Sequence, residues 1–145
     1  MNKLNLQILT FGLMLCFSVL KVNGQVLQSR SDIIKENGYG YESGVTDDGT
    51  KYIYYDKEVT TEQSGKYTQC KAIYFTKLDD GTEICKFWRI LEPKSETNPN
   101  VSYMKKNFVE VDYMKWKDYE TGILYKIEVE EGLCITTAWY DFEKQ

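Results

Sequence analysis

The sequence predicts an α+β fold that consists mainly of antiparallel β-sheet with two short helices. Tyr, Ile, Thr and Val dominate the apolar positions after residue 24, and these residue types favour strands over helices. Glycine turns separate several runs of alternating apolar residues, as expected for hairpins. The predicted order of helix, strands, helix and strands indicates two helix-plus-meander halves. An all-β barrel is the alternative if both helices are absent.

The first 24 residues are typical of a secretory signal peptide. Lys3 precedes an apolar run of about 15 residues (6–20), which is shorter than the roughly 20 residues that a membrane-spanning helix needs. The segment ends in Val22-Asn23-Gly24, with small residues at the two positions that a signal peptidase recognises. We therefore expect cleavage before Gln25 and a single β-rich secreted domain at 25–145 without a membrane span. Its expected location is the periplasm or the extracellular space, and the composition is typical of an AT-rich bacterial genome.

Two segments carry helix signals. In 29–38, Ser29 and Asp32 form a start like a capping box, and Gly38 suits the position after the last helical residue. In 98–109, Asn98 suits the N-cap and Pro99 the first helical position. The apolar residues of this second segment recur at helical spacing, namely Val101, Met104, Phe108 and Val109.

The rest of the chain predicts antiparallel strands. The clearest are 51–55, 67–78, 82–90, 123–130 and 133–140. Tight turns are expected at Asp47-Asp48-Gly49, Asp79-Asp80-Gly81 and Glu130-Glu131-Gly132. The tetrapeptide Asp-Asp-Gly-Thr occurs at 47–50 and again at 79–82, which a repeated hairpin turn explains more simply than a duplication.

Three cysteines remain after residue 24, and an oxidising compartment favours one disulfide among them. A two-residue loop at Asp80-Gly81 places Cys70 and Cys85 on the order of 20 Å apart along the same hairpin. Because a disulfide needs Cα atoms within about 7 Å, these two cysteines are not expected to pair. The predicted bridge therefore joins Cys134 to Cys70 or to Cys85.

The chain has no histidine, which excludes a Ser-His-Asp triad, a Cys-His pair and a His-ligated zinc. Neither a phosphate-binding glycine loop nor a dinucleotide fingerprint occurs, so we expect no cofactor. We also expect no metal site, no catalytic residue and no enzymatic activity. A carboxylate-dependent hydrolase, which needs only two acids, is the enzymatic alternative. After residue 24 the net charge is −6, because the signal contains two lysines and no acid, and this charge disfavours binding to nucleic acid.

Both faces of the central predicted hairpin are apolar. One face carries Ile73, Phe75, Ile84, Trp88 and Ile90, and the other carries Ala72, Tyr74, Leu78, Cys85 and Phe87. Because helices on one side of a single sheet cover only one face, the other face must meet a second layer, a partner or a ligand. The predicted function is therefore non-enzymatic binding of a protein or a glycan through an exposed aromatic surface. Its candidate residues are Trp88, Phe75, Ile73, Trp116 and Trp139. A closed β-barrel that carries a small apolar ligand is the alternative.

Overall fold

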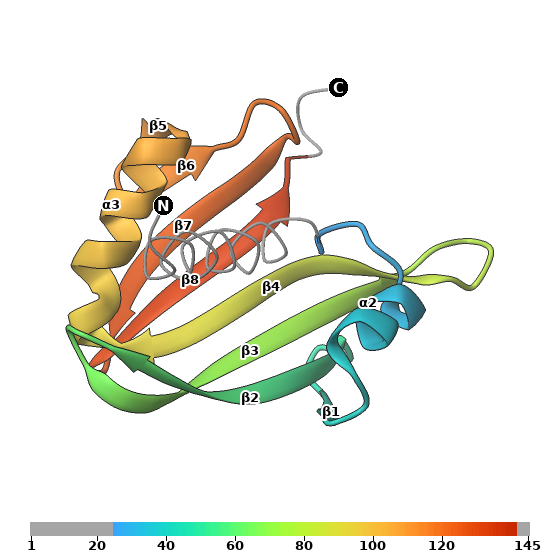
Figure 1. Cartoon of the computed structure of the whole chain (residues 1–145). Helices are drawn as coiled ribbons and strands as arrows, with labels where there is room; N and C mark the ends of the chain where they lie inside the picture. Colours follow the sequence, from blue (N-terminus) through green and yellow to red (C-terminus); the bar gives the residue numbers. More distant parts are fainter. Residues whose placement is uncertain (1–24, 142–145) are drawn as a thin grey trace, which may run out of the picture.

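The computed structural model describes residues 25–141, which contain two α-helices, one 3₁₀ turn and eight strands (Figure 1). The predicted signal peptide at 1–24 lies outside the described residues. In chain order the elements are α2 (Arg30–Asn37), β1 (Glu42–Val45), β2 (Lys51–Thr61), β3 (Gly65–Lys77), β4 (Glu83–Pro93), η1 (Lys94–Glu96), α3 (Thr97–Asn107), β5 (Val109–Asp112), β6 (Lys115–Lys117), β7 (Ile123–Glu130) and β8 (Leu133–Tyr140). None of the helices within 25–141 has the length and apolar character needed to cross a membrane.

The eight strands form one antiparallel sheet in the order β1-β2-β3-β4-β8-β7-β6-β5. Helix α2 is followed by the meander β1–β4 and helix α3 by the meander β5–β8, so the same order of elements occurs twice (Figure 1). Strands β4 and β8, the last of each meander, pair in the middle of the sheet. The predicted α+β class is therefore confirmed. The all-β barrel is wrong, because β1 and β5 lie at opposite ends of an open sheet.

One face of the sheet, which we call the helix-covered face, packs against both helices. A row of directly paired residues crosses six neighbouring strands on this face, and each is at most 1 % exposed: Ile53, Ile73, Trp88, Ala138, Tyr125 and Trp116. Helix α2 adds Ile33 and helix α3 adds Met104 to the same buried cluster. Because side chains alternate along a strand, the opposite face, which we call the outer face, has neither helix packed on it (Figure 1).

Both predicted helices are present, with small differences at their ends. Ser29 caps α2, and its Oγ accepts a hydrogen bond from the backbone N–H of Asp32 at 3.2 Å. Gly38 ends this helix with φ 92°, as predicted for the position after the last helical residue. Helix α3 begins at Thr97, directly after the 3₁₀ turn, and its N-cap is Glu96, so Asn98 is the second helical residue and not the predicted N-cap. Pro99 is therefore the third helical residue, where its missing N–H still removes no intrahelical hydrogen bond.

Three glycine turns close hairpins at the predicted places. The two Asp-Asp-Gly turns form three-residue loops, in which Gly49 and Gly81 have φ of 85° and 89°. The predicted two-residue loop at Asp80-Gly81 is therefore wrong, because Leu78 rather than Asp79 pairs with Thr82. Glu131 and Gly132 form a two-residue loop in which both φ values are positive, at 48° and 81°. Both copies of Asp-Asp-Gly-Thr belong to the first meander, where they join β1 to β2 and β3 to β4. Since these places are not equivalent in the two halves, the repeated turn remains the simpler explanation.

A bulge in β4 changes the predicted register of the central hairpin. Cys85 pairs with Phe75 rather than with Thr76, and the register shifts beside Phe75, so Lys86 is the additional residue of the bulge. The bulge turns Cys85 to the helix-covered face, where it is fully buried, although the sequence places it on the other face.

The predicted disulfide through Cys134 is wrong, because Cys70, Cys85 and Cys134 are all free thiols. Cys134 pairs with Glu92 and is buried on the helix-covered face. Cys70 points to the outer face, so its thiol and that of Cys134 lie on opposite sides of the sheet. Cys85 shares the face of Cys134, but it lies seven residues from Glu92 along β4, a distance of about 23 Å.

Candidate binding face of the sheet

Four of the five predicted binding residues lie in the core. Ile73, Phe75, Trp88 and Trp116 are each at most 4 % exposed on the helix-covered face. An exposed aromatic surface around Trp88 is therefore wrong, because the helices cover the face that carries it. Of the five, only Trp139 lies on the outer face, where it is half-buried. The open aromatic surface is consequently on the opposite side of the sheet from the one predicted.

Aromatic side chains cross the outer face on four neighbouring strands. Tyr52, Tyr74, Phe87 and Trp139 are directly paired in that order across β2, β3, β4 and β8, and each is half-buried. Tyr54 continues the aromatic surface along β2, with its ring centroid 6.4 Å from that of Tyr52. We call these five residues the aromatic row. The aromatic row therefore spans half of the strands in the sheet.

The rings at the β2–β4 end of the aromatic row pack on one another. The centroids of Tyr74 and Phe87 are 4.3 Å apart with an interplanar angle of 14°, so these rings stack face to face. The centroids of Tyr52 and Tyr74 are 5.5 Å apart with a tilt of 39°. Side chains stand roughly perpendicular to a sheet, so rings that stack in this way present edges rather than faces to an incoming molecule.

A hollow of about 330 Å³, which we call the slot, lies at the β4–β8 end of the aromatic row. It is lined by Lys86, Phe87, Arg89, Thr137, Trp139 and Tyr140. Its volume is at the lower end of the roughly 300–1,000 Å³ of typical ligand pockets. The Oγ1 atom of Thr137 is buried and has no hydrogen-bond partner among residues 25–141. The slot therefore offers the rings of Phe87 and Trp139, with Lys86 and Arg89 beside them, to a small group.

Cationic side chains run beside the aromatic row. Arg89, Lys126 and Lys115 lie in one cross-strand line, in which Thr137 occupies the position between the first two. The guanidinium of Arg89 is 5.6 Å from the ring centroid of Phe87, and Lys115 Nζ is 5.3 Å from that of Trp139. Lys126 forms an ion pair with Glu128, whereas Arg89 and Lys115 have no acidic partner within 4 Å in the described part of the chain.

The sequence alone predicts the aromatic row in part but not the line of cations beside it. Alternation correctly predicts Tyr74 and Phe87 on one face, and Tyr52 and Tyr54 alternate in the same way along their strand. No periodicity in the sequence predicts that Arg89 and Lys115 lie near each other, because they are 26 residues apart and belong to different meanders. Only the pairing of β4, β8, β7 and β6 brings them together, in a chain whose overall charge is negative.

Two buried carboxylates near the start of α3 are the other notable group of polar side chains. Glu92 and Glu96 are 8 % and 5 % exposed. Glu92 accepts hydrogen bonds from Tyr67 at 2.9 Å, Gln69 at 2.8 Å and Asn100 at 2.6 Å, and Glu96 accepts from Ser64 at 2.5 Å and from Thr61. These bonds connect the β2–β3 turn to η1 and α3. Because neutral donors already occupy both carboxylates, the pair stabilises the fold and is poorly placed to act on a substrate.

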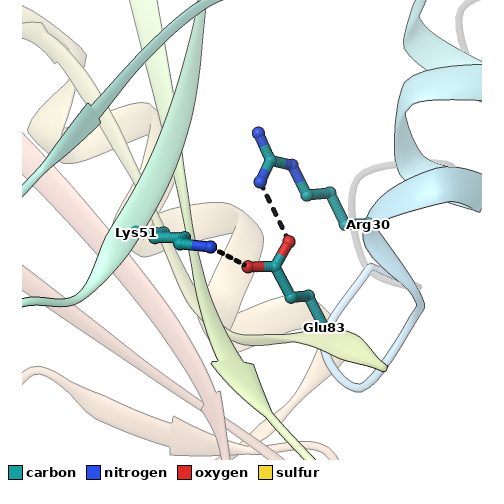
Figure 2. A network of polar contacts seen from close by, with 3 residues as sticks. All are labelled: Arg30, Lys51 and Glu83. Carbon is teal, nitrogen blue, oxygen red and sulfur yellow. Dashed lines mark hydrogen bonds and ion pairs between the residues drawn. The ribbon is translucent and has the colours of Figure 1, made fainter. Parts of the chain in front are cut away.

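An ion-pair network joins α2 to the sheet. Figure 2 shows Glu83 between Arg30 and Lys51, with nitrogen–oxygen distances of 2.9 and 3.1 Å. The hydrogen bonds from Arg30 and then Lys51 lower the pKa of the Glu83 carboxyl. A second hollow, of about 550 Å³, lies beside this network. Because both of these cations are already paired with Glu83, the network fixes the position of the helix.

The described residues contain no further site of recognisable chemistry. Within residues 25–141, no group of three or more His, Cys, Asp or Glu side chains is arranged to hold a metal ion. Comparison with known proteins identifies no relative, since no family model, no curated protein and no solved structure matches the chain. Within residues 25–141, the outer face is therefore the strongest candidate for a functional surface.

Proposed function

We propose that the protein is an exported, non-enzymatic binding module that holds a protein or a glycan against the outer face of its sheet. The observation that supports this proposal is the aromatic row, which lies on the face away from both helices of residues 25–141. Trp, Tyr and Arg are the residues most enriched at interaction hot spots, and they occur together here.

The stacking of Tyr74 on Phe87 stabilises the pairing of β3 with β4, but the sheet does not need rings at all five positions of the aromatic row. The core of the sheet is complete on the helix-covered face, where the buried row from Ile53 to Trp116 is closed by α2 and α3. Polar or β-branched residues at the positions of Phe87 and Trp139 would keep a stable strand and expose less apolar surface. Large rings at these positions, beside cations that have no acidic partner within residues 25–141, therefore support a role in binding.

The two alternative functions receive less support. A carrier that encloses an apolar ligand needs a closed barrel, and the sheet is open. A hydrolase needs two carboxylates that reach a substrate, and Glu92 and Glu96 are buried and accept hydrogen bonds from neutral donors.

The test compares binding to two panels of probes, an array of soluble glycans and a display library of random twelve-residue peptides. The variant Phe87→Ser/Trp139→Ser removes the largest part of the aromatic row, and Tyr39→Ser/Tyr113→Ser is the matched control at exposed positions, where these tyrosines are 83 % and 85 % exposed. We expect at least one panel to contain ligands that lose tenfold or more in affinity with the first variant only. If no ligand from either panel depends on the aromatic row, the proposed function is wrong.

A further inference from the structure

We infer that the partner is a protein segment in which one apolar side chain is flanked by carboxylates. This inference rests on the proposed function and specifies the chemistry of its ligand. The slot would receive the apolar side chain, and Arg89 and Lys115 would pair with the carboxylates on either side of it.

The slot fits a single side chain better than a long polymer. Its rings, Phe87 and Trp139, come from paired positions on adjacent strands, and its volume is about 330 Å³. An aromatic or branched aliphatic side chain inserted there would lose its contact with water, which is how anchor residues act in protein interfaces.

The positive charges of Arg89 and Lys115 beside the slot indicate that the partner's residues next to the anchor are negatively charged. Arg89 and Lys115 lie 5.6 and 5.3 Å from the rings that line or border the slot, and neither has an acidic partner within 4 Å among residues 25–141. Lys86 adds a third positive charge at the slot. A carboxylate on each side of the anchor would neutralise these cations, whereas a basic segment would be repelled.

Other partners fit this arrangement less well. A sugar stacks on an open ring face, but the faces of Tyr74 and Phe87 are turned to each other. An acidic polysaccharide supplies carboxylates but has no aromatic or branched aliphatic side chain to fill the slot. A nucleic acid crossing the sheet would meet Glu42, Asp56, Glu58 and Glu128 near its margins.

The test selects binders for residues 25–145 from the random twelve-residue display library and then measures the enriched peptides by fluorescence titration. Trp139 serves as the reporter when the peptides contain no tryptophan. The variant Arg89→Gln/Lys115→Gln removes two charges at the rim, and Lys105→Gln/Lys106→Gln removes two exposed charges from α3 as the matched control. We expect enriched peptides with one aromatic or aliphatic residue between Asp or Glu. Their affinity should fall at least tenfold with the rim variant and less than twofold with the control.

Every other outcome overturns the inference, and the outcomes differ in whether the proposed function remains valid. Enriched peptides that lack acidic residues, or that bind the rim variant normally, would leave a binding face but exclude acidic flanks. Binding of polygalacturonate or chondroitin sulfate that depends on Phe87 and Trp139, without any such peptide, would make the partner a glycan. A reversible dimer that the rim variant abolishes would make the partner a second copy. If no probe depends on the aromatic row, the proposed function fails as well.

Discussion

Lys71 is an amine held among core residues of the helix-covered face. Its Nζ donates a hydrogen bond to Gln25 Oε1 at 2.5 Å and lies 5.1 Å from the ring centroid of Trp88. Burial lowers the pKa of Lys71 to about 8. The pKa of lysine in an unfolded chain is about 10.4, so between these two values the unfolded state binds more protons than the folded state. Lys71 therefore makes the free energy of unfolding rise with pH across this window.

The variant Lys71→Met should remove this contribution. We expect the free energy of unfolding of the wild type, minus that of the variant, to rise by about 1–3 kcal/mol from pH 7.5 to pH 10. Urea unfolding at each pH measures the two values, and other titrating groups largely cancel in the difference. Lys105→Met, at an exposed position of α3, is the control and should give a flat difference. A flat difference for Lys71→Met as well would contradict the prediction.

The three thiols of residues 25–141 should react slowly in the folded protein. Burial raises the pKa of Cys85 to about 12 and that of Cys70 to about 11, and it also raises the pKa of Cys134. At pH 8 all three are therefore neutral, and the thiolate that iodoacetamide requires is scarce. Intact-mass measurement of residues 25–145 should show little labelling in native buffer and three labels in concentrated guanidinium chloride. A mass two hydrogens lower that reductant restores would instead reveal a disulfide.

At the level of single elements, the β7–β8 turn has one residue that suits its backbone poorly. Glu131 has φ 48° and Gly132 has φ 81°, as a type I′ turn requires. Asn accepts the left-handed region more readily than Glu, so Glu131→Asn should stabilise the protein by about 0.5–1 kcal/mol. Gly132→Ala should destabilise it by about 1 kcal/mol through backbone strain alone, since no atom lies within 4 Å of the added Cβ. Urea unfolding of both variants tests these two predictions. If Glu131→Asn and Gly132→Ala change the free energy of unfolding in the same direction, the prediction is wrong.

The elements differ in how far local sequence determines them. The bounds of β7 and β8 agree with the prediction, because alternation and a two-residue glycine turn define both strands. The short strands β1, β5 and β6 are not among the strands that the sequence predicts clearly, since three or four residues contain too little alternation. The bulge at Lys86 is a tertiary feature, because the additional residue in β4 brings both Phe75 and Cys85 into the buried cluster.

At the scale of the whole molecule, alternation predicts two apolar faces but not which one the helices cover. Trp88 and Phe87 are neighbours, and either could have been the exposed ring on sequence grounds. Which face is exposed depends on where α2 and α3 pack. Contacts of Ile33 and Met104 with residues distant in the chain determine that position. The predicted disulfide is wrong for a related reason. Cys70 and Cys134 lie on opposite faces of the sheet, and Cys85 lies about 23 Å along β4 from the residue that pairs with Cys134.

The distribution of the three tryptophans provides a direct test of this arrangement. Trp88 and Trp116 are at most 1 % exposed, whereas Trp139 is half-buried on the outer face, with Lys115 Nζ 5.3 Å from its ring centroid. We expect iodide to quench only the fraction of the emission that Trp139 contributes, because iodide reaches only the exposed indole.

The neighbouring cations should also make the quenching depend on the charge of the quencher. Iodide is attracted to Arg89 and Lys115 and caesium is repelled, so iodide should be the better quencher by about twofold or more at low salt, with the difference falling as salt screens the charges. Trp139→Phe should abolish the accessible fraction, and Arg89→Gln/Lys115→Gln should bring the two quenchers closer together. Emission that stays quenchable by iodide after Trp139→Phe would mean that Trp88 or Trp116 is exposed. In that case α2 and α3 would not cover the face that carries Trp88 and Trp116, and the assignment of a buried face and an outer face would be wrong.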